Sequence, residues 1–196
     1  MNNFEKNITF VIVSFKSGHI IEKCIKSINS SIKIIVVENS DNIEVKNCLE
    51  NKIPFGTGKD ETRSIAISDL NKDGWSDLIL ANINEPNSIC FGDASMSFKN
   101  IIKLDNVKDA SFSIDVADYD QDGDVDILVG NSGEPNRIYQ NLGDGKSYKM
   151  MLLSSQDFDT YDIRFGDLDK DGFKDVVEEN SKEVNVYYIN RKKIRQ

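Results

Sequence analysis

A nine-residue, aspartate-rich segment occurs three times in this sequence, at a constant interval of 49 residues. The copies read DLNKDGWSD from Asp69, DYDQDGDVD from Asp118 and DLDKDGFKD from Asp167. Self-similarity at a fixed period is the signature of a repeat architecture, in which each unit buries its faces only by stacking on its neighbours. This repeat therefore constrains the fold more than any other feature of the 196-residue chain.

Each repeat predicts one small antiparallel sheet. Apolar residues alternate in SIAIS, SIDVA and DIRFG, which precede the aspartate-rich segments, and a period of two is typical of a half-buried strand. A second strand follows each segment, then a shared Asn-x-x-Glu-x-Asn turn and a third strand, and the first two repeats add a fourth strand. We therefore expect a mainly β fold, a partial β-propeller of about three antiparallel blades at residues 60–106, 109–155 and 158–196.

Residues 1–52 do not share the repeat and predict a short α/β segment. The apolar, β-branched stretches ITFVIVSF (8–15) and KIIVV (33–37) are typical of buried strands. Between them, apolar residues recur at helical spacing on one face. Strand, helix and strand in this order form a βαβ unit, whose two strands run parallel. We thus expect two domains, residues 1–52 and residues 53–196.

The aspartate-rich segments have the pattern of metal-binding loops. Counted from the first aspartate, oxygen-bearing side chains occupy positions 1, 3, 5 and 9, and glycine occupies position 6 in all three loops. Alternate oxygens can curl round one ion, the glycine permits the tight turn, and the backbone carbonyl of position 7 can add a ligand. An all-oxygen, carboxylate-rich set favours Ca²⁺ over Mg²⁺ and over metals that prefer histidine or cysteine. We predict up to three Ca²⁺ sites with the following ligands: Asp69, Asn71, Asp73, Trp75 and Asp77; Asp118, Asp120, Asp122, Asp124 and Asp126; Asp167, Asp169, Asp171, Phe173 and Asp175.

The loops differ from an EF-hand and from one another. An EF-hand needs a glutamate at position 12 followed by a helix, whereas position 12 here is Leu80, Val129 and Glu178. An aspartate- and glycine-rich turn without an ion is the alternative interpretation of the same residues. Asn71 replaces the aspartate found at position 3 of the other two loops, so we predict that the first loop binds Ca²⁺ most weakly.

The charge balance narrows the range of partners. A net charge of −9 disfavours nucleic acids and anionic membrane surfaces, because both require a basic face. No apolar stretch approaches the roughly 20 residues that a membrane-spanning helix needs, so we expect no membrane insertion. The 3 cysteines are an odd number without a Cys-x-x-Cys pair, which indicates free thiols rather than a disulfide framework or a zinc site.

With its strands, turns and aspartate loops, the region from about residue 55 to residue 190 resembles FG-GAP/VCBS-type repeats. The segment NLGDGKSY (141–148) also belongs to this resemblance. The resemblance implies Ca²⁺-stabilised blades of an integrin-like β-propeller that binds a protein or carbohydrate ligand, usually on secreted or cell-surface proteins. A closed ring needs more than three blades, so we also expect self-association through open blade edges.

A second resemblance lies near the N-terminus. The stretches ITFVIVSFKSGHIIEKCIKSI and KIIVVENSDN resemble the start of family 2 glycosyltransferases. This resemblance implies that Ser14, Phe15 and Glu38 contact the nucleotide of a sugar donor. The Asp-x-Asp metal motif, acceptor region and catalytic base of that family come later in its chains, where the repeats stand in this sequence. The segment is thus expected to be truncated, incomplete and inactive alone.

The sequence leaves three functional hypotheses open. The first is a non-enzymatic Ca²⁺-binding repeat module for binding or adhesion, in which the ion has a structural role. The second is a glycosyltransferase-related protein that depends on a partner for its missing site, and the third is a fragment without an independent function. The repeats favour an extracellular or cell-surface location, whereas the absence of a signal peptide favours the cytoplasm. Ca²⁺-dependent folding would favour the first hypothesis, and nucleotide-sugar binding the second.

Overall fold

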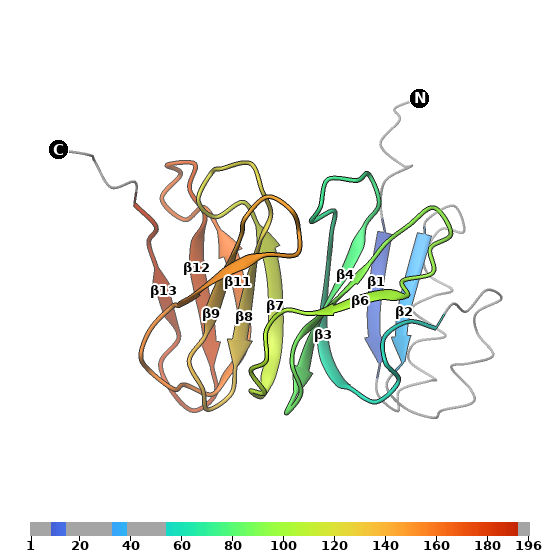
Figure 1. The fold of residues 1–196 in the computed structure, drawn as a ribbon. Coiled ribbons are helices and arrows are strands. Elements are labelled where there is room, and N and C mark those ends of the chain that lie inside the picture. Colours follow the sequence, from blue (N-terminus) through green and yellow to red (C-terminus); the bar gives the residue numbers. More distant parts are fainter. Residues whose placement is uncertain (1–8, 15–32, 39–53, 192–196) are drawn as a thin grey trace. The chain divides into compact units, whose positions relative to one another are not determined.

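In a computed structural model of the chain, the described residues are 9–14, 33–38 and 54–191, and all their regular elements are strands (Figure 1). The chain divides into two compact units, Met1–Pro54 and Phe55–Gln196. No described residue belongs to a helix that is long and apolar enough to span a membrane. The second unit contains all three aspartate loops.

The first unit contains two parallel strands, β1 (Thr9–Ser14) and β2 (Lys33–Glu38). Their register places Thr9 opposite Lys33 and Ser14 opposite Glu38. Valine, isoleucine and threonine dominate both strands, as expected for strands of a parallel sheet. The predicted pair of parallel strands is therefore confirmed, whereas the helix predicted between them lies outside the described residues.

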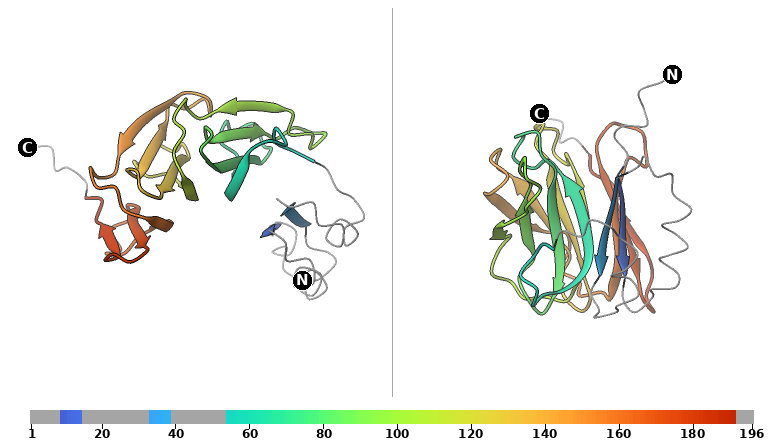
Figure 2. Two further views of the ribbon diagram at one scale, coloured as in Figure 1. Left: turned by 90° about the horizontal axis from the view of Figure 1, so that it is seen from below. Right: turned by 90° about the vertical axis from the view of Figure 1, so that its right-hand side faces the viewer.

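The second unit consists of three antiparallel sheets, each built from consecutive strands in chain order, and Figure 2 (left) shows the sheets in succession. The sheets contain four, four and three strands, which is consistent with propeller blades. The predicted mainly β fold with three antiparallel sheets is thereby confirmed. The first sheet contains β3 (Glu61–Ser68), β4 (Asp77–Ile83), β5 (Ser88–Phe91) and β6 (Asn100–Lys103); the second contains β7 (Ser111–Ala117), β8 (Asp126–Asn131), β9 (Arg137–Asn141) and β10 (Tyr148–Leu152); the third contains β11 (Thr160–Gly166), β12 (Asp175–Asn180) and β13 (Val186–Tyr188).

Equivalent apolar residues of successive sheets form the two interfaces between the sheets. The interface of the first and second sheets contains Ile79, Ile89, Ile114 and Ile127. The interface of the second and third sheets contains the residues that lie 49 positions further on, Leu128, Ile138, Ile163 and Val176. Each is at most 3% exposed, and burying one such side chain stabilises the fold by about 1.5–3 kcal/mol. The core of the second unit therefore lies between its sheets.

The Asn-x-x-Glu-x-Asn turn also joins neighbouring sheets. In the first sheet, Asn87 Oδ1 accepts the backbone N–H of Asn82 at 2.8 Å and closes the turn. Asn87 Nδ2 then donates to Ser111 Oγ of the second sheet at 3.0 Å. One repeat further on, Asn136 Nδ2 donates to Thr160 Oγ1 of the third sheet at 2.9 Å. The second asparagine of the motif thus holds both its own turn and the next sheet.

Candidate metal centres

Each aspartate loop connects the first strand of its sheet to the second. The glycines at position 6 have φ values of 89°, 91° and 92°, a left-handed conformation that side chains disfavour. The residues at position 4 are also left-handed, with φ values of 57°, 61° and 63°, so the three loops follow one backbone path. The loops are named loop 1 (69–77), loop 2 (118–126) and loop 3 (167–175).

The aspartate at position 9 holds each loop from within, and Asp77, Asp126 and Asp175 are all 0% exposed. In loop 2, Asp126 accepts the backbone N–H of Tyr119 through Oδ2 and that of Asn141 through Oδ1, both at 2.8 Å. The equivalent two bonds occur in loops 1 and 3. Burial raises the pKa of Asp126 to about 6 and also raises the pKa of Asp77, because desolvation disfavours the ionised carboxylate.

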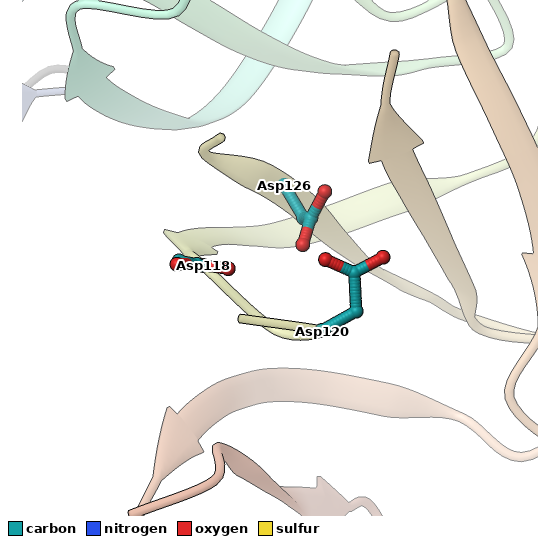
Figure 3. Close-up of side chains that lie close together, drawn as sticks. All are labelled: Asp118, Asp120 and Asp126. Carbon is teal, nitrogen blue, oxygen red and sulfur yellow. The ribbon is translucent and has the colours of Figure 1, made fainter. Parts of the chain in front are cut away.

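Loop 2 brings three carboxylates together (Figure 3). One oxygen each from Asp118, Asp120 and Asp126 lies within 4.8 Å of the others. Asp118 Oδ1 is buried and accepts no hydrogen bond from the described part of the chain. Burial, together with the neighbouring charge of Asp122, raises the pKa of Asp120. Converging carboxylates repel one another and a buried oxygen without a partner is costly, so the donor set fits a hard cation such as Ca²⁺.

Loop 3 repeats the arrangement. The oxygens that lie within 4.8 Å of one another belong to Asp167, Asp169 and Asp175. The aspartate at position 5 accepts the backbone N–H of position 7 instead, as in loop 1: Asp122 Oδ1 accepts the N–H of Asp124, and Asp171 Oδ1 accepts the N–H of Phe173, both at 2.8 Å. The structure therefore brings positions 1, 3 and 9 together, and ligation by positions 5 and 7 stays a prediction.

Loop 1 shares contacts with the other loops and differs from them at position 3. As in loops 2 and 3, the aspartate at position 1 accepts the N–H of the glycine at position 6, here Asp69 Oδ2 from Gly74 at 2.8 Å. Asn71 Nδ2 donates to Asp73 Oδ2 at 2.9 Å, so the amide that replaces an acid at position 3 already holds a neighbouring carboxylate. Weaker Ca²⁺ binding at loop 1 stays a prediction, and the contact of Asn71 agrees with it.

Neighbouring loops also contact one another at their surfaces. Lys72, at position 4 of loop 1, has its Nζ 2.5 Å from Asp124 Oδ1 of loop 2, and this hydrogen bond raises the pKa of Lys72. One repeat further on, Gln121 Nε2 donates to the carbonyl of Gly172 in loop 3 at 2.9 Å. Sequence reasoning missed both contacts. The sequence feature that could have indicated them is a long polar side chain at position 4 of each loop.

The residues assigned to a nucleotide-sugar site by resemblance belong to the first unit. Ser14 and Glu38 pair with one another at the ends of two parallel strands. Phe15 lies outside the described residues. A nucleotide-binding role for the three residues stays a prediction.

Comparison with known proteins identifies the repeats. A family model described as FG-GAP-like repeat matches residues 69–129 and 118–178, which together span more than half of the 196 residues. No curated protein matches the chain, and nothing in the comparisons supports a glycosyltransferase segment at residues 8–50. Each match runs from one aspartate loop into the second strand of the next sheet. The chain therefore belongs to the FG-GAP-like repeat family.

Proposed function

We propose that the chain is a calcium-binding repeat module in which up to three Ca²⁺ ions stabilise the sheets, whose exposed faces bind a partner. The proposal is carried by the convergence of Asp118, Asp120 and Asp126 beside a buried oxygen of Asp118 that has no hydrogen-bond donor among the described residues. The equivalent cluster of loop 3 supports it. An all-oxygen donor set without histidine or cysteine suits Ca²⁺.

The residues of each loop have separable tasks in this function. The buried aspartate at position 9 fixes the loop to its own sheet through two backbone N–H groups, as Asp126 does in loop 2. The side chains at positions 1 and 3 add oxygens that repel one another until a cation neutralises them. At a free Ca²⁺ concentration of about 100 times the Kd of a site, binding at that site adds about 2.7 kcal/mol to the free energy of unfolding.

The far face of the third sheet supports a role in binding. In the second sheet, the residues at the same repeat positions as this far face lie at the interface with the third sheet, and one of them, Ile138, is 1% exposed. Tyr187, at the same repeat position, is 65% exposed. We propose that this face takes part in self-association through the open edge of the blades, and that the module binds a protein or carbohydrate ligand. The far face of the third sheet is defined by Val177, Glu179 and Tyr187.

Thermal melting of the full chain tests the calcium proposal. Melts are compared in EDTA, in about 2 mM Ca²⁺ and in about 2 mM Mg²⁺, a concentration that fills weak extracellular-type sites. We expect Ca²⁺ to raise Tm by about 5–10 °C for each well-occupied site, and Mg²⁺ to raise it less. Asp118→Asn combined with Asp120→Asn should remove the contribution of loop 2, whereas the exposed control Asp157→Asn should keep it. A Tm that Ca²⁺ does not change would refute the proposal.

Sedimentation tests the binding face separately. Self-association through the far face of the third sheet predicts a concentration-dependent sedimentation coefficient for the wild-type chain. Tyr187→Asp should abolish that dependence, because it places a charge on the exposed apolar face. The control Tyr161→Asp changes another exposed tyrosine and should leave the dependence intact. A wild-type chain that stays monomeric at all concentrations would exclude self-association through this face.

A further inference from the structure

A buried asparagine connects loop 2 to loop 1. Asn141 ends β9 and is 1% exposed. Its backbone N–H donates to Asp126 Oδ1 at 2.8 Å, and its side-chain Nδ2 donates to the carbonyl of Leu70 in loop 1 at 2.9 Å. Leu70 in turn donates its own N–H to Asp77 Oδ2 at 2.9 Å. Asn141 and Leu70 therefore link the buried aspartates of the two loops.

The same link recurs one repeat further on. The N–H of Asn190 donates to Asp175 Oδ1 at 2.9 Å, and Asn190 Nδ2 donates to the carbonyl of Tyr119 in loop 2 at 3.0 Å. The N–H of Tyr119 donates to Asp126 Oδ2 at 2.8 Å. The two links meet at Asp126, so one chain of hydrogen bonds runs from Asp175 of loop 3 to Asp77 of loop 1.

Whether the linking position holds asparagine or glycine depends on whether an aspartate loop precedes it. The first-sheet equivalent of the two linking asparagines is Gly92, whose N–H donates to Asp77 Oδ1 at 2.9 Å. Gly92 has no side chain, and a Cβ at this position would lie 2.2 Å from the carbonyl oxygen of Ser76. No aspartate loop precedes loop 1 in this sequence. Asparagine thus stands at the two positions that have a preceding loop to hold, and glycine at the position that has none.

We propose that Asn141 and Asn190 are positioning residues that couple cation binding at neighbouring loops, an inference that rests on the proposed calcium function. A cation at Asp126 fixes its carboxylate and hence the N–H donors of Asn141 and Tyr119. Through Asn141 it also fixes the carbonyl of Leu70, and with it the backbone that holds Asp77. The bonds of Asn141 and Leu70 are buried and those of Tyr119 and Asn190 are partly buried, so water competes for them less than for the contact of the exposed Lys72. Both sites therefore act on one contiguous hydrogen-bonded element, through which binding at one loop can change the binding free energy at the other.

The single tryptophan allows loop 1 to be observed in preference to the other loops, because energy transfer to Tb³⁺ falls steeply with distance. Trp75 occupies position 7 of loop 1, so selective excitation of tryptophan will sensitise the emission of Tb³⁺ bound there. The Kd of Tb³⁺ at loop 1 is measured in the full chain with loop 2 intact and with loop 2 disabled by Asp118→Asn and Asp120→Asn. We expect disabling loop 2 to weaken binding at loop 1 by about fivefold or more. In an Asn141→Asp background, the same disabling should change the Kd by less than about twofold.

The substitution is chosen to remove the link and keep the local turn, although it also removes a longer bond of 3.3 Å from Asn141 Nδ2 to the carbonyl of Val125 in loop 2. Asn141 Oδ1 accepts the N–H groups of Gly143 and Gly145, both at 3.0 Å, and an aspartate retains that acceptor. It replaces the amide donor by an oxygen, which cannot bond the carbonyl of Leu70. Asn141→Ser is the second variant should the aspartate prevent folding. Asn190→Asp is the matched control, because it breaks the link between loops 2 and 3 and should preserve coupling between loops 1 and 2.

Each outcome separates the coupling from the calcium function. The inference is overturned if disabling loop 2 raises the Kd of Tb³⁺ at loop 1 equally with and without the Asn141 substitution. It is also overturned if disabling loop 2 leaves that Kd unchanged in the chain that keeps Asn141. Absence of Trp75-sensitised emission, or loss of coupling in the Asn190→Asp control, overturns it too. In all these cases a Ca²⁺-dependent melt still supports the proposed function, whereas a Ca²⁺-independent melt removes that function itself.

Discussion

The second and third sheets carry the same repeat, but their far faces have different surroundings. In the second sheet, Leu128 and Ile138 are 0% and 1% exposed, because the third sheet covers them. At the same repeat positions of the third sheet, Val177 and Tyr187 are 38% and 65% exposed. The repeat position alone therefore does not determine burial. In a stacked repeat the neighbouring sheet does, and the stability of such a protein resides largely in its interfaces.

The largest expected contrast is between Leu128→Ala and Val177→Ala. Leu128 is fully buried in the interface, so removing its side chain leaves a cavity and should lower the free energy of unfolding by about 2–5 kcal/mol. Val177→Ala should lower it by less than about 1 kcal/mol, because the side chain is partly exposed. Urea denaturation in excess Ca²⁺ measures both values. Equal losses would mean that the far face of the third sheet is covered in solution.

A second contrast adds one methyl group to the interface. A Cβ at Gly130 would lie 2.9 Å from Ile163 Cγ2 and 3.2 Å from Thr160 Cγ2 of the third sheet. Gly130→Ala should therefore destabilise the chain by about 1–3 kcal/mol through overpacking. At the same repeat position of the third sheet, exposed Glu179 should tolerate alanine within about 0.5 kcal/mol. Unchanged stability of the Gly130→Ala chain in urea denaturation would contradict the prediction and show that Ile163 and Thr160 can move aside at little cost.

A third contrast concerns the last asparagine of the turn motif. Asn136 closes its own turn and also donates to Thr160 and to Glu178, a carboxylate that is 0% exposed. Asn185 closes the equivalent turn by accepting the N–H of Asn180 at 2.9 Å, and it is exposed. Asn136→Ala should therefore cost about 1–2 kcal/mol more than Asn185→Ala, since a buried carboxylate oxygen loses a donor. Chemical denaturation of both variants at one pH checks the difference, and identical midpoints would contradict it.

Local features of the fold could be predicted from the sequence because they depend on residues close in the chain. Alternating apolar residues and the constant interval of 49 residues predicted the strands, the sheets and the loops. The spacing also selected positions 1, 3, 5, 7 and 9, of which the structure brings the side chains at 1, 3 and 9 together in loops 2 and 3. The second task of Asp126, to accept two backbone N–H groups in the interior, was missed. Metal-ligand spacing does not show which way a carboxylate is buried.

Contacts between sheets could not be predicted in the same way. The bond from Asn141 to Leu70 spans 71 residues and exists only because the sheets are stacked. Glu178, which the sequence shows only as position 12 of the third loop, is fully buried, and Asn136 of the preceding sheet donates to its carboxylate. Alignment of the repeats contained one signal for these contacts, asparagine at two positions and glycine at the third. This pattern can be interpreted only when the structure shows which preceding loop each asparagine contacts.

The smallest expected contrast is electrostatic and compares Lys72 with Lys170. Lys72 places a positive charge beside Asp124 of loop 2, whereas Lys170 holds the same position in loop 3, which no described loop follows. Lys72→Met should raise the Ca²⁺ affinity of loop 2 by about two- to threefold, as expected for an exposed charge, and Lys170→Met should leave it unchanged. Calorimetric titration of chains in which loops 1 and 3 are disabled by Asp69→Asn and Asp167→Asn isolates loop 2. Repeating the titrations at several salt concentrations shows whether charge causes the increase in affinity, because an effect of exposed charge must fade as ionic strength rises above about 0.1 M. An increase that persists in high salt would show that Lys72 acts on loop 2 through its contact with Asp124 rather than through its charge.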